Sequence, residues 1–402
     1  MPGRPSFRVL ALVLAFGVSL FGVRRPVVEA GVRQQADDEP KSEESKKKEG
    51  KAGKSSKDKS SKKGGKKKRD EGEKDGSRAF PQGPREEEFK QRLGEHFEVR
   101  RTDHFFVIYD ADEEVVKDFI SRLERTYDSV HRFASQLDIE LEYPKEKLPV
   151  VFCRNFEEYD GKCKEMVGRN VPAEAAGLYW HDPFNFSIFY DMSQAKFIKE
   201  HEAHAKQLKE EARNSKDPNE RKMKVREAEW YLNKIDAFQQ DQNRSVVQHE
   251  LAHQLLFNFR IHVPGADNPQ WFVEGLATQF EPPPGKMGAG LGVTNQRRLH
   301  GLREKFKEGV PDVREFVGSP GDGGMLSSDG YAISWGLVNY LVKQKGKGLP
   351  KYIKLLKERR IGRQVSPEQA IADFESCFGK VDAAFARKWV EYIKKLPYRK
   401  PS

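Results

Sequence analysis

Apolar residues gather in short runs in the middle of the chain and recur at helical spacing toward its end. The runs His104–Asp110 and Leu148–Cys153 are compact apolar blocks bounded by polar residues, which is typical of buried strands. Between them, Glu113–Ser135 carries an apolar residue every three or four positions, which predicts a helix. Gly177–Trp180 and Phe186–Tyr190 are expected to form a strand pair that turns at 182–185.

The second half of the chain predicts helices. Lys196–Asn243 is mostly charged, and we interpret it as an inserted helical hairpin that breaks near Asp217-Pro218. Further helices are predicted over 244–259, 269–281, 295–307, 330–345, 350–359, 366–378 and 382–396. Strands followed by helices favour one α+β domain over residues 87–402, with an N-terminal mixed sheet and a mainly helical half.

The N-terminus has the pattern of an export signal over residues 1–30. Arg4 and Arg8 precede an apolar run, Val9–Val23, and small residues at Val28-Glu-Ala30 offer a cleavage site. The run of about 15 residues is short for a membrane span of ~20, although Arg24-Arg25 leaves an uncleaved anchor open. The chain is therefore expected to be periplasmic, on the cell surface or secreted.

Residues 31–86 are rich in Lys, Ser and Glu and are expected to form a disordered linker. Lys46–Arg69 holds thirteen Lys or Arg against two acids, a net +11 that accounts for the whole-chain charge of +10. This tract is a solvated spacer or binds an anionic envelope polymer or membrane surface. Because the remaining chain is near neutral, nucleic acid is not an expected partner. The three cysteines, Cys153, Cys163 and Cys377, are too few for a disulfide scaffold; we expect buried thiols, with a Cys153–Cys163 bridge as the alternative.

The strongest chemical signal is H-E-L-A-H within an otherwise apolar helix. His249 and His253 stand one turn apart on one helix face, so both imidazoles can bind one metal ion. Glu250 is offset by roughly 100° from His249, too far round the helix to bind the same ion easily. Zinc lowers the pKa of a bound water toward ~7, and Glu250 is the carboxylate that can take its proton.

A catalytic zinc also needs a third protein ligand. The sixth residue after His253 is Phe259, which excludes the metzincin pattern, and the remaining candidates are His262, Asp267 and Glu274. Glu274 is favoured because it stands among apolar residues, where an unpaired carboxylate is costly to bury. The alternatives are a packing or surface role for His262, an Asp267 that turns back, and a Glu274 that is solvated or salt-bridged.

Two other histidine patterns have simpler interpretations. His201-Glu-Ala-His204 belongs to a highly charged helix and is expected to be a solvated face. His181 lies between two predicted strands and is expected to be a turn residue.

The order H249-E-L-A-H253, about twenty residues, then W271-F-V-E274-G-L-A-T278 resembles the gluzincin pattern of thermolysin-like and aminopeptidase-like zinc peptidases, the peptidase MA-like superfamily. The likeness is specific over 245–281 and loose over 88–345. The lysine-rich leader and the Tyr331–Leu341 helix are similar to a group of exported bacterial gluzincin-like proteins. The resemblance implies a zincin fold of the thermolysin type.

The resemblance also implies roles for individual residues. His249, His253 and Glu274 would bind one Zn2+, and Glu250 would be the general base. Tyr331 would donate a hydrogen bond to the developing oxyanion.

Tyr340 is the alternative donor, and either tyrosine could instead be a core aromatic. Phe186–Tyr190 would be the edge strand that binds an extended peptide by strand addition. Thr278 stands where related enzymes often carry an acid that orients a histidine, and its hydroxyl could serve behind the ligands instead. Glu281 lies two turns after Glu274.

The predicted function is zinc-dependent hydrolysis of peptide bonds in a peptide or protein substrate, by a monomer. The Gly-rich amine-recognition segment of aminopeptidases is absent, which favours endopeptidase action. One alternative is a catalytically inactive gluzincin-fold protein that binds or scaffolds at the cell envelope. Another is an adhesion protein that acts through the lysine tract; deleting residues 36–85 would separate it from a peptidase.

Overall fold

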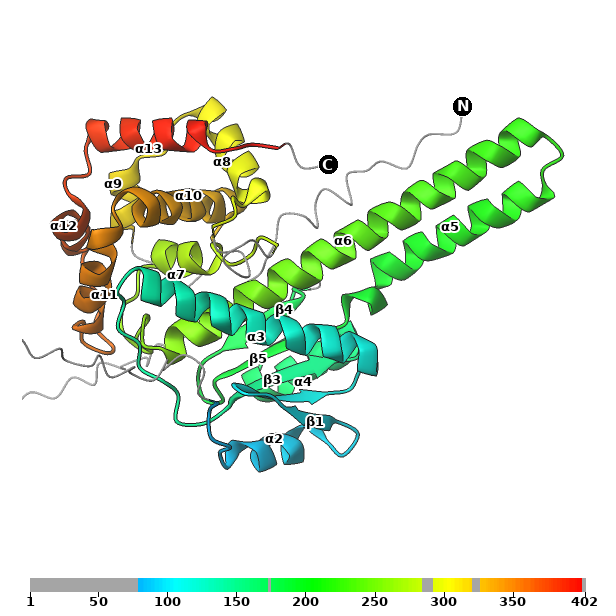
Figure 1. The fold of residues 1–402 in the computed structure, drawn as a ribbon, viewed down its shortest axis with the longest axis horizontal. Helices are drawn as coiled ribbons and strands as arrows, with labels where there is room; N and C mark the ends of the chain where they lie inside the picture. The colour runs from blue at the N-terminus through cyan, green and yellow to red at the C-terminus, as the bar shows by residue number, and fades with distance from the viewer. Residues whose placement is uncertain (1–78, 173–174, 284–291, 320–325, 400–402) are drawn as a thin grey trace, which may run out of the picture. The chain divides into compact units, whose positions relative to one another are not determined.

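The computed structural model describes residues 79–172, 175–283, 292–319 and 326–399 (Figure 1). The predicted signal peptide and the tract Lys46–Arg69 lie outside these residues. The folded part begins earlier than the predicted boundary at 86/87, because Phe80 is buried and its backbone N–H donates to Asp103 O at 2.8 Å. Helix α2 then starts at Arg85.

The described chain is α+β, with the sheet formed first and most helices afterwards. The strands are β1 Glu98–Arg101, β2 Phe105–Tyr109, β3 Leu148–Cys153, β4 Gly177–Trp180 and β5 Phe186–Tyr190. The helices are α2 Arg85–Leu93, α3 Glu113–Gln136, α4 Phe156–Val167, α5 Lys196–Asn214, α6 Pro218–Asn258, α7 Gln270–Ala277, α8 Gln296–Glu308, α9 Val313–Gly318, α10 Ser328–Gln344, α11 Leu349–Lys357, α12 Pro367–Phe378 and α13 Ala383–Lys395, with 3-10 turns η1 Met192–Gln194 and η2 Gly346–Gly348. Apolar periodicity did not predict β1, α2, α4 or α9, which are short or rich in charged residues.

The five strands form one mixed sheet in the order β1-β2-β3-β5-β4. β2, β3 and β5 are parallel to one another, whereas β1 and β4 pair antiparallel with β2 and β5. The prediction that Phe186–Tyr190 is an edge strand is therefore wrong. β5 lies between β3 and β4, every one of its residues is buried, and β4 is the edge strand instead.

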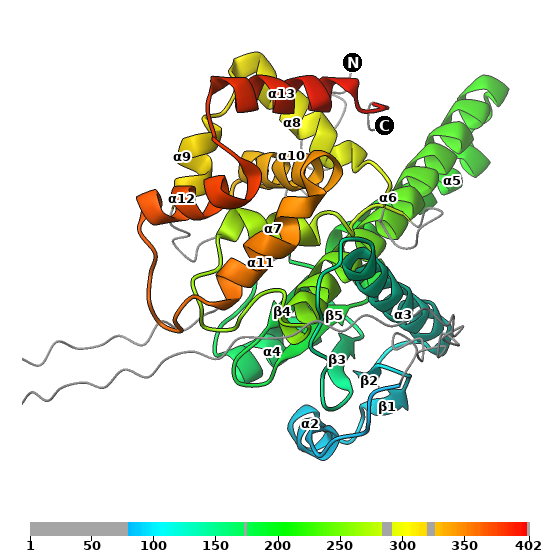
Figure 2. The same cartoon turned by 60° about the vertical axis from the view of Figure 1, so that its left-hand side comes forward.

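Alternation along β5 decides which helices cover each face of the sheet. Phe186 packs against Phe89 of α2, and Tyr190 packs against Tyr159 of α4. On the other face, Phe189 packs against Phe119 of α3. The Ser187 hydroxyl, on this second face, donates to Gln254 of α6 at 3.0 Å. The sheet is therefore buried on both faces, and α6 reaches it on the α3 side (Figures 1 and 2).

Helix α6 is much longer than predicted. It begins at Pro218, where the Asp217 side chain accepts from Asn219 N, and continues without a break to Asn258. The predicted hairpin does turn at Asp217-Pro218, but its second arm and the predicted helix 244–259 are one helix. Figure 1 shows α5 and the first part of α6 as an antiparallel pair extending away from the sheet. The histidine motif and the second arm of the hairpin therefore belong to one continuous helix.

Among the described residues, none of the helices is both long and apolar enough to cross a bilayer. Cys153 and Cys163 are free, buried thiols rather than a bridge. Burial raises the pKa of Cys163 to about 12, so this thiol is inert.

Candidate metal centre

The histidine motif lies in the buried half of α6. Leu251, Leu255 and Leu256 are fully buried and belong to the main hydrophobic core. His249 and His253 are also buried, at 3% and 0% exposure, and one helical turn separates them. Their Nε2 atoms lie 3.0 Å apart, so both rings converge on one point.

Glu274 reaches the same point from helix α7. All residues from Trp271 to Ala277 are buried, and Glu274 has no exposed surface. Its Oε2 atom lies 3.2 Å from His249 Nε2 and 3.4 Å from His253 Nε2. The three donor atoms all lie within 4.8 Å of one another. Of the three candidate third ligands, Glu274 is the one that the fold brings to the histidines.

The electrostatics of this group favour a bound cation. Burial raises the pKa of Glu274, but the lowering effect of His253 and His249 is stronger. The pKa falls to about 2, so the carboxylate is ionised. At His253, burial lowers the pKa more than Glu274 raises it. The pKa of His253 falls to about 4, and its imidazole is neutral. At His249, burial is outweighed by the carboxylates of Glu274 and Glu281, and the pKa rises to about 10. A positive charge, either a proton or a metal ion, is therefore stabilised between these side chains.

The donor set also fits a metal chemically. Within the described part of the chain, the buried Oε1 atom of Glu274 has no hydrogen-bond partner. Two imidazole nitrogens and a carboxylate with a spare oxygen are the ligands that zinc takes in catalytic sites. The residues present therefore suit zinc.

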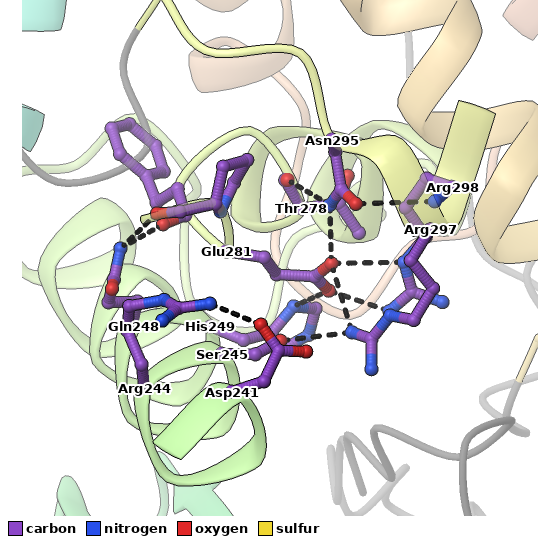
Figure 3. A network of polar contacts seen from close by, with 12 residues as sticks. Asp241, Arg244, Ser245, Gln248, His249, Thr278, Glu281, Asn295, Arg297 and Arg298 are labelled. Carbon is purple, nitrogen blue, oxygen red and sulfur yellow. Dashed lines mark hydrogen bonds and ion pairs between the residues drawn. The ribbon is translucent and has the colours of Figure 1, made fainter. Parts of the chain in front are cut away.

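Glu281 is the carboxylate behind His249. Its Oε1 atom lies 3.0 Å from His249 Nδ1 (Figure 3), whereas Glu274 contacts the other ring nitrogen, Nε2. Because Glu281 is ionised, Nδ1–H donates to it, and Nε2 is left as the ring nitrogen that would exchange its proton for a metal ion. Burial alone would raise the pKa of Glu281, but its positive neighbours outweigh burial and hold this pKa well below its usual range. Arg298 has the strongest effect among these neighbours.

Helix α8 and the residue before it supply the rest of this network. Asn295 donates to Glu281 Oε2 at 2.7 Å, and Arg297 does so at 3.3 Å. Arg298 donates from Nε to Oε2 at 3.0 Å and from Nη2 to Oε1 at 2.6 Å. Figure 3 shows these side chains converging on Glu281, with Arg297 also reaching Ser245 of α6.

Thr278 does not contact a metal-site histidine. Its hydroxyl donates to Gly275 O at 2.8 Å, within its own helix turn. The idea that this hydroxyl acts behind the ligands is therefore wrong, and Glu281 takes that position. The sequence offered a signal for Glu281 only in its spacing from Glu274, because its arginine partners lie beyond the next loop.

Glu250 is buried between α6 and the edge strand. Its Oε2 atom accepts from the backbone N–H of Tyr179 in β4 at 2.9 Å. Its negative charge also acts on His249, whose pKa it raises along with the other carboxylates. The carboxylate thus lies beside the donor group and does not belong to it.

Tyr331 lies at the start of α10, close to the histidines. Its ring centroid is 6.2 Å from that of His249, and the Arg298 guanidinium lies 4.9 Å from the Tyr331 ring centroid. The alternative, Tyr340, packs among Phe385 and Tyr392 and is a core aromatic. Tyr331 is therefore the tyrosine that the fold places at this site.

The remaining candidates lie elsewhere. Asp267 accepts from Val365 N at 2.7 Å and so faces the C-terminal segment. His262 is fully buried against Phe257 and Phe272, and burial lowers its pKa to about 3. It is a packing histidine, and the surface alternative is excluded.

The other two histidine patterns are also structural. His201 and His204 are half-buried against Tyr231 of α6, so the expected solvated face is instead part of the hairpin contact. His181 follows β4, and the Tyr179 hydroxyl lies 2.8 Å from its Nδ1.

Comparison with known families gives one match. Residues 243–361 match a family model described as a protein of unknown function, DUF1570. The matched segment contains His249, Glu250, His253, Glu274 and Tyr331, together with Glu281 and Arg298. A comparison with curated proteins finds no match. The family match therefore covers the candidate metal centre, and the family description assigns it no activity.

Proposed function

We propose that this protein is a zinc-dependent peptidase of the gluzincin type. The observation that carries the proposal is the convergence of His249, His253 and Glu274, all buried, with their donor atoms within 4.8 Å of one another. A buried carboxylate facing two imidazoles is costly without a cation. The sequence order of these ligands resembles the gluzincin order, which supports the zincin fold as part of the same proposal.

In this proposal His249, His253 and Glu274 hold the ion. Zinc, when bound, supplies a Lewis acid that activates water and polarises a carbonyl. Glu250 acts as the general base: it stands beside the ligands, outside the ligand set, and can take a proton from the attacking water. Tyr331 supplies a hydrogen bond to the oxygen on which negative charge develops.

The edge strand β4 supports a peptide as the substrate. The Tyr179 N–H donates to Glu250, so this amide points away from the paired strand β5 and toward α6. A peptide bound along the outer edge of β4 would lie beside the Glu250 carboxylate, which itself holds the Tyr179 N–H. The lack of a Gly-rich amine-recognition segment in the sequence favours internal cleavage of peptides in this proposal.

The metal content of the purified chain, measured by elemental mass spectrometry, tests the first part of the proposal. About one zinc per wild-type molecule is expected, and His253→Ala should lose it. His204→Ala is the matched control, since it removes a histidine of the H-E-A-H pattern in α5 and should keep the zinc. A wild-type chain that binds no zinc even after zinc is added would refute the metal centre.

Hydrolysis of a fluorescent casein substrate tests the second part. Glu250→Gln should retain zinc and lose activity by about 10²–10⁴-fold, because the amide cannot accept the proton. A zinc-bound wild type without hydrolysis of any peptide library would instead favour the alternative, a gluzincin-fold binding protein.

A further inference from the structure

Arg298 connects two parts of the site that come from different helices. It is 4% exposed, and both of its donors on one edge are used by Glu281. The face of the same guanidinium lies over the ring of Tyr331, with its central carbon 4.9 Å from the ring centroid. One buried cation therefore contacts the carboxylate behind His249 and the candidate oxyanion donor.

The fork from Arg298 fixes how Glu281 meets His249. Glu281 Oε1 accepts from both His249 Nδ1 at 3.0 Å and Arg298 Nη2 at 2.6 Å. Oε2 is held by the Arg298 Nε at 3.0 Å, so the carboxylate plane cannot rotate without breaking a charged hydrogen bond. The orientation and tautomer of the His249 ring then follow from the position of Arg298.

The ring of Tyr331 limits where Arg298 can lie. Guanidinium groups stack on aromatic faces, and an ammonium reproduces neither this stacking nor the planar fork. Arg297 also contacts Glu281, but it makes one longer bond at 3.3 Å and shares its donor with the Ser245 hydroxyl. Arg298 is thus the arginine with the geometry to set the carboxylate.

We propose that Arg298 is a positioning residue for the metal ligand His249, acting through Glu281, and that the ring of Tyr331 holds Arg298 in place. This gives Tyr331 a second role, in metal affinity, that depends on its ring and not on its hydroxyl. The inference rests on the proposed metal centre, but it concerns metal binding and does not require hydrolysis.

The experiment measures zinc affinity by competition with a chromophoric chelator, using zinc alone. Arg298→Met should weaken zinc binding by about 10–100-fold, and Arg298→Lys should lie between it and wild type. Tyr331→Leu should weaken binding several-fold, whereas Tyr331→Phe, which keeps the ring, should bind like wild type. The double variant Arg298→Met/Tyr331→Leu should bind no more weakly than Arg298→Met alone.

Arg303→Met is the matched control. Arg303 lies on the same helix and stacks on the ring of Tyr398 at 4.5 Å, but it donates to the backbone oxygens of Lys394 and Leu396. The Arg303→Met variant should therefore bind zinc with wild-type affinity. Replacing zinc with Co2+ adds a spectroscopic readout: the visible absorption band should shift in Arg298→Met and stay unchanged in Arg303→Met.

Arg298→Met leaves a buried carboxylate with fewer partners and could unfold the chain, so Glu281→Gln/Arg298→Met, which removes both charges, provides a second test. It should fold and show the same loss of zinc affinity. Wild-type zinc affinity in this folded variant would overturn the inference. So would equal losses in Tyr331→Phe and Tyr331→Leu. A wild-type chain that binds no zinc would instead refute the proposed function itself.

Discussion

Replacing Gly275 with Ala tests how the close approach of α7 and α10 builds the site. Gly275 directly follows Glu274, the proposed third ligand. A Cβ atom at this position would lie 2.5 Å from Val338 Cγ2 and 2.7 Å from the backbone oxygen of Ser334. The valine methyl can rotate away, but the carbonyl belongs to α10, so the two helices have to separate.

The size of the effect follows from these distances. Ordinary contact begins at 3.4 Å, so the Ser334 carbonyl must move by about 0.7 Å, from 2.7 to 3.4 Å. Overpacking of this kind costs ~1–3 kcal/mol, and alanine returns up to ~1 kcal/mol through helix propensity. We expect a net loss of about 1–2 kcal/mol in the free energy of unfolding and a thermal midpoint lower by roughly 2–6 °C.

We expect Gly275→Ala to reduce the rate of hydrolysis more severely than the free energy of unfolding. α7 carries Glu274 and α10 carries Tyr331, so their separation misplaces a ligand and a hydrogen-bond donor together. Shifts near 1 Å can reduce rates by on the order of 10²-fold. We therefore expect hydrolysis to fall by at least tenfold while the chain remains folded.

Thermal unfolding followed by circular dichroism, in buffer with a chelator, separates the packing effect from stabilisation by metal. Gly161→Ala is the control: it lies inside helix α4, and a Cβ there meets nothing within 4 Å. It should gain ~0.5–1 kcal/mol. If Gly275→Ala had the midpoint of Gly161→Ala and wild-type hydrolysis, the argument from helix approach would be refuted.

Three further changes test other parts of the structure. Glu274→Gln should weaken zinc binding strongly; a chelator should then lower the wild-type thermal midpoint but leave that of the variant unchanged. His262 has a pKa of about 3 in the folded chain, below its unfolded value of ~6.5. As the pH falls from 6.5 toward 3, the unfolded chain takes up a proton that the folded chain excludes. The free energy of unfolding therefore decreases by up to ~1.4 kcal/mol per pH unit. Chelator-treated His262→Leu should show a weaker decline in its urea midpoint between pH 7 and 5, and an equal decline would contradict this assignment. Ser327→Ala removes the cap that accepts from Gly330 N at 3.1 Å and should cost ~1 kcal/mol by urea unfolding.

The sequence by itself indicated the candidate ligands His249, His253 and Glu274, which the fold brings together. It also indicated Glu250 as the candidate base, because the spacing of side chains around one helix is a local property. Residues at i and i+4 lie on one face of any helix. An acidic residue in an apolar segment indicates a positively charged partner, because an unpaired charge is costly to bury. The α+β order and most helices followed from the same local patterns. The zincin fold remains a prediction from the resemblance.

Only the tertiary structure decided the neighbours of these residues. Strand order depends on pairing between distant segments, so the sequence suggested β5 as the edge and the fold placed β4 there. The sequence placed the start of the motif helix at 244 because the preceding arm is mostly charged. Its few apolar residues, among them Ile235 and Phe238, are buried only once α5 and the rest of the fold pack against them. Glu281 and Arg298 meet across the segment between α7 and α8, and no local pattern records a contact of that kind.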